Sequence, residues 1–550
     1  MKSKLSVFIA FVLLFAILSL LLSCGRTAKL NTGNDKSLLD TTGFKRDLFI
    51  LSSDSMEGRM PGTRGGKRAA DYIANRFRQY GLIPCSADQG YFQKVNIESF
   101  QPDYTTAKIS ITGKNFEEKI IPYNEMILIS RDEKPSVDVE GDLVFVGYGT
   151  VAPEYEWDDY KNVDVSDKIV VCLFNHPDFR SPDYTAGQTT YYGKFDCKAE
   201  TAFRKGAKGI LFIFQEDLFP YDHWQNVISN FSFGDYAPSS KIPMVSYITE
   251  SAFDRIMANE KMNLSQLIEK ADSKDFHPFP LSMKIHASFK QKIKKYSTHN
   301  VIGYVRGTKR PDEAFIYMAH YDHLGVMRPV QGDSIYNGAI DNASGTAGII
   351  SLAKYFSVHP PERSVVFLAT TAEELSFQGV FHYLAHPLIP LEKTIAGVNI
   401  DMMDFLGSTD SINLSQLQYT DAYNAVKSVT DEMNIGLNAS GIDKMYLNFR
   451  LESYPFALHD ILMLNLVFKD IGNHHDAVSD NQLEMIKSMG GLNYHTPFDE
   501  IKPWFRYDGI LQELELAKNI GLFYSNKGKK PIFRDNNPYE PAKTMWISKH

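Results

Sequence analysis

Residues 315–325 read FIYMAHYDHLG, a short apolar run that ends in a cluster of histidine and carboxylate side chains. Two later runs have the same form: VVFLA at 365–369 is followed by TTAEE, and GVNI at 397–400 is followed by Asp401. Between the first two runs, residues 345–356 have the apolar character of a buried helix. Short apolar strands that alternate with helices predict an α/β fold with a mostly parallel mixed sheet and helices on both faces.

The polar residues that follow these strands are candidates for a functional site, because ligands of open α/β sheets bind beyond the carboxyl ends of the strands. They are His320, Glu373, Glu374 and Asp401. Two further segments carry similar residue types, DNASG at 341–345 and YHTPFD at 494–499. We expect the side chains after the strands to surround one crevice.

This combination of residues suits a pair of divalent metal ions. Imidazoles and carboxylates are zinc ligands, and two ions about 3.5–4 Å apart need a bridging carboxylate. A further acid must take a proton from water, and the adjacent Glu373 and Glu374 can supply one ligand and one such acid. Taken alone, Asp341 could be a helix N-cap, the two glutamates a solvated helix start and His495 a turn residue. Their joint occurrence in this order favours the metal site.

Five segments, in this order, resemble metallopeptidase family twenty-eight, the di-zinc aminopeptidases related to glutamate carboxypeptidase and the transferrin receptor. They are AHYDHLG at 319–325, DNASG at 341–345, AEE at 372–374, NIDM at 399–402 and YHTPFD at 494–499. The resemblance spans about residues 44–525 and implies the zinc-peptidase fold.

The resemblance also implies a role for each metal ligand. His320 and Asp401 would hold one zinc ion, and Glu374 and His495 would hold the other. Asp341 would bridge the two ions, and the peptide bond that follows it would be cis. The implied cofactor is therefore two zinc ions for each chain.

Three further side chains receive catalytic roles from the resemblance. Glu373 would be the general base and then the acid that protonates the leaving amine. Asp322 would be the carboxylate that fixes the ring of His320, and Tyr494 would donate a hydrogen bond to the oxyanion. His323 is left without a role in metal binding, and we expect it beside the ligands.

One segment departs from the family pattern. Many members carry Arg-Ser-Asp-His before a Pro-Phe pair in the late substrate-binding loop, whereas residues 450–456 here read RLESYPF. Arg450 and the Pro-Phe pair are retained, but Glu452 and Ser453 differ from the pattern. Arg450 is thus a candidate substrate-binding residue, and the residue preference at the cleaved end stays open.

The N-terminal segment has the features of a bacterial lipoprotein signal peptide. Lys2 and Lys4 precede an uncharged run, and LLSC at 21–24 resembles a lipobox in which Cys24 becomes the lipidated first residue. An extracytoplasmic protein anchored to a membrane is the resulting expectation, facing the periplasm or the cell surface. An uncleaved anchor helix is the alternative reading of the same run.

The expected domain organisation follows from these segments. FVGYG at 145–149 and the residues after it resemble the protease-associated domain that many members of the family contain. The sequence predicts the following parts: 1–23 signal peptide, 24–43 tether, 44–134 and 290–525 zinc-peptidase domain, 135–289 inserted mainly-β protease-associated domain with its connection, and 526–550 C-terminal tail.

Composition narrows the possible partners. Lys and Arg number 58 against 66 Asp and Glu, so the net charge of −8 offers no general excess of cations for nucleic acid. Four cysteines exclude a disulfide scaffold and a Cys-rich zinc module, and whether Cys172 and Cys197 pair stays open.

We therefore expect an aminopeptidase that acts on peptide substrates. A carboxypeptidase or a one-zinc glutaminyl cyclase on the same fold is an alternative, and so is a non-catalytic binding lipoprotein. The binding lipoprotein is disfavoured because all five ligand positions and Glu373 are present. The chain has no Gly-x-Ser-x-Gly and no His-Glu-x-x-His motif, which argues against a serine hydrolase and a zincin.

Overall fold

The structure is a computed structural model that describes residues 39, 41–179, 189–215, 221, 225, 232–234, 242–438, 447–466, 493–535 and 537–547. The predicted signal peptide, the lipidated Cys24 and most of the tether lie outside these residues. Within the described ranges, no helix combines the length and the apolar character that crossing a membrane requires.

A largely parallel sheet forms the centre of the main unit, as the sequence predicts. Strands β20, β17, β13 and β16 lie side by side in this order and run parallel, and β12 pairs antiparallel with β16. The side chains of β16, β17 and β20 are buried along their whole length, which is typical of parallel strands covered on both faces. The strand bounds are β12 (Phe279–Val305), β13 (Arg310–His320), β16 (Arg363–Thr370), β17 (Thr394–Ile400) and β20 (Met463–Leu466).

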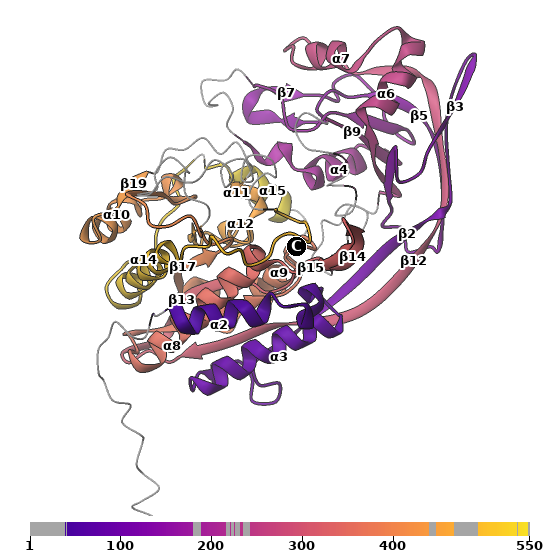
Figure 1. Cartoon of the computed structure of the whole chain (residues 1–550). Helices are drawn as coiled ribbons and strands as arrows, with labels where there is room; N and C mark the ends of the chain where they lie inside the picture. Colours follow the sequence, from indigo (N-terminus) through magenta and orange to yellow (C-terminus); the bar gives the residue numbers. More distant parts are fainter. Residues whose placement is uncertain are drawn as a thin grey trace, which may run out of the picture.

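Helices flank this sheet (Figure 1). Helices α3, α8 and α14 pack on its strands, whereas α9 and α12 contact each other and reach β12 and β20, respectively. The hydroxyl of Tyr317 on β13 donates to the carbonyl of Ala517 on α14 at 2.8 Å, which fixes one helix on the sheet. The helix bounds are α2 (Thr41–Leu51), α3 (Arg64–Gln79), α8 (Gly345–Val358), α9 (Gln378–Ala385), α10 (Tyr423–Glu432), α11 (Leu447–Arg450), α12 (Ser453–Ala457), α14 (Tyr507–Asn526) and α15 (Glu540–Ile547).

An inserted unit is joined to the main unit by two long strands, β2 and β12 (Figure 1). Strand β12 pairs with β16 at residues 301–305 and with β5 at 279–290, so one sheet continues through both units. In the inserted unit β5, β8, β9 and β11 run parallel, and β4 closes the edge. The bounds are β2 (Phe92–Gly113), β3 (Phe116–Ile120), β4 (Met126–Ile129), β5 (Ser136–Phe145), β8 (Ile169–Cys172), β9 (Gly209–Phe214), β11 (Met244–Thr249), α4 (Phe195–Arg204), α6 (Glu250–Met257) and α7 (Leu264–Ala271).

Short elements complete the fold. They are β1 (Ile83–Pro84), β6 (Val151–Ala152), β7 (Trp157–Asp158), β10 (Ser232–Gly234), β14 (Gly325–Val330), β15 (Asp333–Tyr336), β18 (Ser411–Asn413) and β19 (Gly436–Asn438). Strands β14 and β15 form a hairpin directly after the AHYDHLG segment. Cys85, Cys172 and Cys197 are free thiols, so Cys172 and Cys197 do not pair in this structure.

Two segments pack across the domain boundaries that the sequence predicts. The core of the inserted unit begins before residue 135, because Ile109, Ile111 and Leu128 are buried in it. At the other end, the predicted tail at 526–550 packs on the main unit as far as it is described, since Phe533 and Tyr539 belong to its core. Widely spaced aromatic residues fix this segment, and they leave no helical or strand periodicity in the sequence.

Candidate metal centre

The carboxyl ends of neighbouring strands bring the predicted residues together. His320 is the last residue of β13, Glu373 and Glu374 lie in the turn after β16, and Asp401 directly follows β17. Because these strands are parallel neighbours, their ends lie at the same edge of the sheet. Asp341 reaches this edge from the segment before α8.

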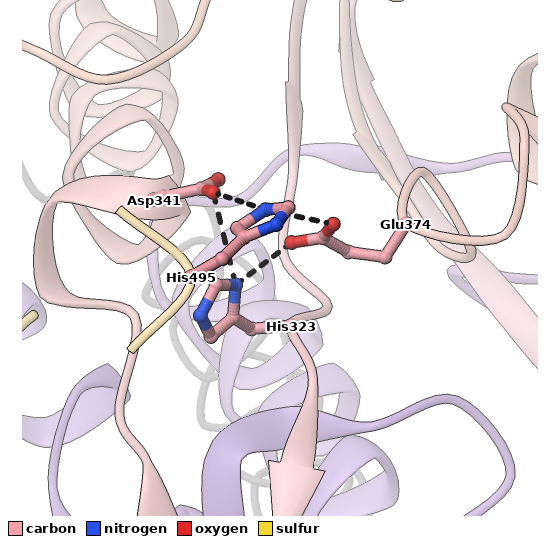
Figure 2. A group of neighbouring side chains, drawn as sticks. All are labelled: His323, Asp341, Glu374 and His495. Carbon is pink, nitrogen blue, oxygen red and sulfur yellow. Dashed lines mark hydrogen bonds and ion pairs between the residues drawn. The ribbon is translucent and has the colours of Figure 1, made fainter. Parts of the chain in front are cut away.

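The donor atoms form two groups that share Asp341. In the first group, His320 Nε2 lies 3.2 Å from Asp341 Oδ1 and 3.4 Å from Asp401 Oδ1. In the second, His495 Nε2 lies 3.1 Å from Asp341 Oδ2 and 3.1 Å from Glu374 Oε2 (Figure 2). One carboxylate oxygen of Asp341 thus faces each group, which is the arrangement of a bridging ligand.

The groups fit a pair of cations, because several of their buried atoms have no hydrogen-bond partner among the described residues. Those that face the donor groups are His495 Nε2 and Asp401 Oδ1. His495 Nε2 is 3.1 Å from two carboxylate oxygens and forms a hydrogen bond with neither. Buried polar atoms without partners are uncommon, and a cation between these atoms would satisfy the nitrogen and the oxygens together. Nitrogen and oxygen donors in sets of three or four suit zinc.

Residues 300–510 match the model of peptidase family M28, a range that holds every predicted ligand. Over this range the chain is similar to peptidase family M28. The match covers the strands β13, β16, β17 and β20 together with the turns that follow them.

Curated relatives of the chain include two aminopeptidases. Aminopeptidase NAALADL1 of Mus musculus is 28% identical over 138 residues, which are 24% of this chain and 17% of the mouse protein. Aminopeptidase YwaD of Bacillus subtilis (strain 168) is 30% identical over 110 residues, 20% of this chain and 22% of that protein. The chain thus spans about a fifth of the length of these relatives in each match.

A solved structure extends the likeness in fold to almost the whole chain. The aminopeptidase from Aneurinibacillus sp. strain AM-1 aligns over 92% of this chain and 99% of its own, with a TM-score of 0.55 and 18% identity. At this identity the alignment shows a shared fold.

His323 extends the second donor group of the candidate site (Figure 2). Its Nδ1 lies 2.8 Å from Glu374 Oε1 and 3.9 Å from Asp341 Oδ2. The sequence predicts His323 beside the ligands, and its ring lies against Glu374. Its ring holds the carboxylate oxygen of Glu374 that does not face His495.

The DNASG segment joins the ligand-bearing loops through Asn342. Its side-chain amide donates to the carbonyl of Ile400 at 2.9 Å, and its Oδ1 accepts from the amides of Gly345 at 2.9 Å and Met402 at 3.2 Å. A Cβ on Gly345 would lie 2.2 Å from that same carbonyl, so only glycine permits the approach. The bond between Asp341 and Asn342 is cis, as the family resemblance implies. The segment therefore fixes Asp341 relative to Asp401.

Asp499 and Arg59, to which the sequence assigns no role, form hydrogen bonds with the backbone around the Asp341 loop. Asp499 accepts hydrogen bonds from the backbone amides of Ile340 at 2.9 Å and Asp341 at 3.0 Å. The guanidinium of Arg59 is fully buried, and it donates to four backbone carbonyls at 2.5–2.8 Å. These carbonyls belong to Leu51, Tyr321, Asn337 and Gly338. In the sequence, Arg59 stands at the end of SSDSMEGR at 52–59, a run of turn-forming residues, and nothing in this run indicates that its side chain is buried.

Asp322 contacts His320, as predicted, and it also holds the turn that carries Glu373 and Glu374. Its carboxylate accepts from the backbone amides of Glu373 at 3.2 Å and Glu374 at 3.4 Å, so it holds the turn that carries both glutamates. The Nδ1 atom of His320 lies 3.2 Å from the backbone oxygen of Asp322 and 4.0 Å from its carboxylate. Asp322 therefore orients His320 mainly through its backbone.

Neighbouring charges govern the pKa values of the candidate metal ligands. Burial lowers the pKa of His320, but Glu373, Asp401 and Asp341 outweigh burial and raise it well above its usual range. Burial likewise lowers the pKa of His495, but the carboxylates of Glu374 and Asp341 outweigh burial and raise this pKa to about 9. Zinc binding would therefore release protons from these rings, and zinc affinity should fall as the pH falls.

Two carboxyls next to the ligands have raised pKa values. Burial raises the pKa of Glu373 well above its usual range; Glu374, Asp401 and Glu452 add to the rise, and His320 opposes it. Burial also raises the pKa of Glu452 to about 8. Glu452 accepts a hydrogen bond from Thr370 Oγ1 at 2.8 Å, while its Oε1 has no partner among the described residues.

Tyr494 and Arg450 lie at the same site. The ring of Tyr494 stacks on His495 with 3.7 Å between centroids. Burial raises the pKa of Tyr494 well above its usual range. The positive charge of Arg450 opposes this rise, and the carboxylates of Asp341, Glu374 and Glu373 add to it. Tyr494 thus lies against one of the candidate metal ligands, and the charge of Arg450 acts on Tyr494.

The backbone around the centre takes up conformations that sequence patterns do not reveal. Ala372, Met402 and His495 have positive φ values of 57°, 59° and 56°. Each of them is a ligand or lies within two residues of one. Such conformations cost free energy in residues other than glycine and persist where the surrounding contacts determine them, as they do at functional sites.

Proposed function

We propose that the protein is an extracytoplasmic, lipid-anchored aminopeptidase that holds two zinc ions and removes N-terminal residues from peptides. The observation that carries this proposal is the sharing of Asp341 between two donor groups, with Glu373 next to Glu374 in the chain and part of neither group. The named relatives that are aminopeptidases support the choice of reaction.

His320, Asp401 and Asp341 would hold one ion, and Glu374, His495 and Asp341 would hold the other. Bound zinc supplies Lewis-acid polarisation of a carbonyl group and lowers the pKa of water. These five side chains supply two imidazoles and three carboxylates, so the carboxylates balance most of the charge of two divalent ions.

The remaining residues bind substrate and move protons. Glu373 takes a proton from the attacking water and gives it to the nitrogen of the leaving amine, a transfer that its raised pKa suits. Asp322 holds the Glu373 backbone in place through its 3.2 Å hydrogen bond. The hydroxyl of Tyr494 donates to the oxygen that becomes negative in the transition state. Arg450 binds the substrate at the edge of the centre.

A panel of dipeptides tests the reaction. The zinc-loaded protein should release free amino acids from dipeptides with a free N-terminal amine, whether the C-terminus is free or amidated. It should leave N-acetylated dipeptides intact, because an aminopeptidase recognises the amine. Liquid chromatography of the products measures both outcomes.

The same panel separates the alternative functions. Cleavage of N-acetylated dipeptides that requires a free C-terminus would show a carboxypeptidase. Loss of ammonia from an N-terminal glutamine without peptide cleavage would show a cyclase. Binding without any turnover would show a non-catalytic binding protein, and each of these results would overturn the aminopeptidase proposal.

Lipid anchoring makes a separate prediction about Cys24. Cells that express the wild-type chain and are fed a labelled fatty acid should yield a labelled protein in the membrane fraction. Cys24→Ala should remove the label, because no thiol remains to receive the lipid, and Cys85→Ala should retain it. A wild-type chain that stays with the membrane but carries no label would show a plain anchor helix instead.

A further inference from the structure

Helices α2 and α3 lie beside each other on the outside of the main unit (Figure 1). The inner side of each helix belongs to the hydrophobic core of that unit. The carboxylate of Asp47 on α2 joins the two helices, because it accepts from the hydroxyl of Tyr72 at 2.6 Å and lies 3.2 Å from Nε of Arg76. Since both inner sides face one core, the outer sides of α2 and α3 form one continuous surface.

This surface carries cations at helical spacing, with exposed positions that follow one another at intervals of three or four residues on each helix. Asp54 is the one fully exposed carboxylate of residues 41–79, and Glu57 and Asp71 are partly exposed. The whole chain has 58 basic and 66 acidic residues, so the charge of this surface is opposite to that of the molecule. We call the following exposed side chains the basic face: Lys45, Arg46, Phe49, Arg64, Lys67, Arg68 and Arg78.

The ion pairs within the basic face are weak competitors for its cations. Lys67 pairs with Asp71 at 2.6 Å, but the two side chains are 75% and 45% exposed. Arg64 and Arg68 share the single carboxylate of Glu57. Ion pairs between exposed side chains contribute little to stability, so a dense layer of external anions can bind these cations instead.

An aromatic ring lies among these cations. Phe49 is 67% exposed, and it follows Lys45 and Arg46 by four and three residues on the same side of α2. Exposure of an apolar ring to water is unfavourable. A ring surrounded by Lys and Arg is typical of helices that lie in a membrane interface, where the ring enters the headgroup layer and the cations bind anionic lipids.

The predicted anchor brings the basic face to a membrane. Helix α2 begins at Thr41, 17 positions after Cys24. A chain of this length spans about 20–25 Å as a random coil and at most about 60 Å when fully extended. Within the described ranges α2 is the first helix after the anchor, so its first residue stays within that distance of the lipid surface.

We propose that the basic face docks on the headgroups of anionic lipids in the membrane that holds the anchor. This inference rests on the proposed lipid anchoring and adds an orientation to it. Phe49 enters the headgroup layer, and the six cations bind phosphate groups around it. Single cations at a membrane surface bind weakly, whereas an acyl chain together with a basic patch gives stable attachment. The basic face therefore determines how the anchored protein lies on the membrane.

Fluorescence of an introduced tryptophan tests the docking in the full chain. Phe49→Trp places a probe on the basic face, and Phe203→Trp places one at a 40% exposed residue of α4 in the inserted unit. Each variant is reconstituted in vesicles of phosphatidylcholine or of an equal mixture with phosphatidylglycerol, and it is compared with the wild type and its four tryptophans. Brominated lipid, which quenches tryptophan on contact, should quench Phe49→Trp in the mixed vesicles alone. Phe203→Trp should be quenched in neither.

Charge variants then assign the quenching to the basic face. Reversal of three cations of α3 should abolish the quenching of Phe49→Trp in mixed vesicles: Arg64→Glu, Lys67→Glu and Arg68→Glu. Reversal of three exposed lysines of β12 changes the net charge equally and should leave the quenching intact: Lys284→Glu, Lys290→Glu and Lys292→Glu. Thermal unfolding reports whether each variant is folded. High salt should also reduce the quenching, because it screens exposed charges, and this comparison needs no charge variant.

Several results would overturn the basic face as a docking surface. An anchored Phe49→Trp chain that is quenched in neither kind of vesicle would do so, and so would equal quenching in both. A blue shift of its emission without quenching would show that a second copy of the chain covers Phe49. The intact mass of the purified chain reports separately whether Cys24 carries a lipid. An unlipidated chain contradicts the proposed anchoring, and its quenching in added mixed vesicles still decides the basic face.

Discussion

Replacing Glu373 by glutamine should lower kcat by at least about 100-fold while both zinc ions stay bound, because general acid–base catalysis typically contributes 10²–10⁴-fold. The side chain of Glu373 belongs to neither donor group, so its loss removes no metal ligand. Glutamine has nearly the same shape but can neither accept nor return the proton. A 100-fold loss corresponds to about 2.7 kcal/mol of activation free energy. KM should change little, because the lost interaction belongs to the transition state.

The neighbouring Glu374 should respond in the opposite way. Its Oε2 lies 3.1 Å from His495 Nε2 and its Oε1 2.8 Å from His323 Nδ1, so both oxygens face the second donor group (Figure 2). Glu374→Gln should lower the zinc content, and any loss of turnover should follow from the missing zinc. Zinc content by mass spectrometry and turnover of one aminoacyl substrate separate the two variants.

Glu432→Gln provides the matched control, since the same substitution on an exposed residue of α10 should affect neither quantity. Near-normal turnover in Glu373→Gln would contradict its role as the proton carrier. Loss of zinc from Glu373→Gln with retention in Glu374→Gln would show that the two roles are exchanged.

The ligand set could be predicted because each ligand carries a local signal. His320, Glu373, Glu374 and Asp401 follow apolar strands, and parallel strands place their carboxyl ends at one edge. A continuous apolar run is a strong signal of a buried strand, and the structure confirms these strands within a few residues at each end.

The residues that hold the ligands in place could not be predicted in the same way. Arg59 lies far from the ligands in sequence and contacts backbone carbonyls, which every residue possesses, so no pattern of residue types identifies its partners. Asp499 stands four residues after His495 and holds the amide of Asp341, a pairing across 158 positions. Only the folded chain shows that these buried charges fix the bridging carboxylate.

The sequence gives no clear signal of where the inserted unit begins, and the reason is different. Strands β2 and β12 keep a period of two residues as they pass from one unit into the other, so periodicity does not change at the boundary. The contacts of Lys194, the residue directly before α4, could not be predicted either, because a lysine before a helix resembles any surface residue. Its position between Phe377, Phe449 and Tyr454 depends on how the inserted unit packs on the main unit.

Replacing the shared ligand, Asp341→Asn, should remove both zinc ions, whereas His320→Ala should mainly remove one. Asp341 Oδ1 faces His320 and its Oδ2 faces His495, so a neutral amide weakens both donor groups at once. Substitution of groups that only support a metal ligand costs about 10–100-fold in metal affinity, and a direct ligand should cost at least as much. The wild type should hold two zinc ions for each chain, His320→Ala about one and Asp341→Asn almost none.

Thermal unfolding supplies an independent measurement of the same prediction, because a ligand that binds only the folded state stabilises it. A chelator should lower the Tm of the wild type and of the surface control Asp431→Asn, and it should leave the Tm of Asp341→Asn unchanged. In Asp341→Asn the backbone amide at position 341 can still donate to Asp499, so the loop keeps that anchor and the loss reports on the carboxylate itself. One zinc ion in a fully active wild type would reject the bridging role of Asp341 and favour the cyclase alternative. Retention of two ions by Asp341→Asn would show that the two donor groups bind independently.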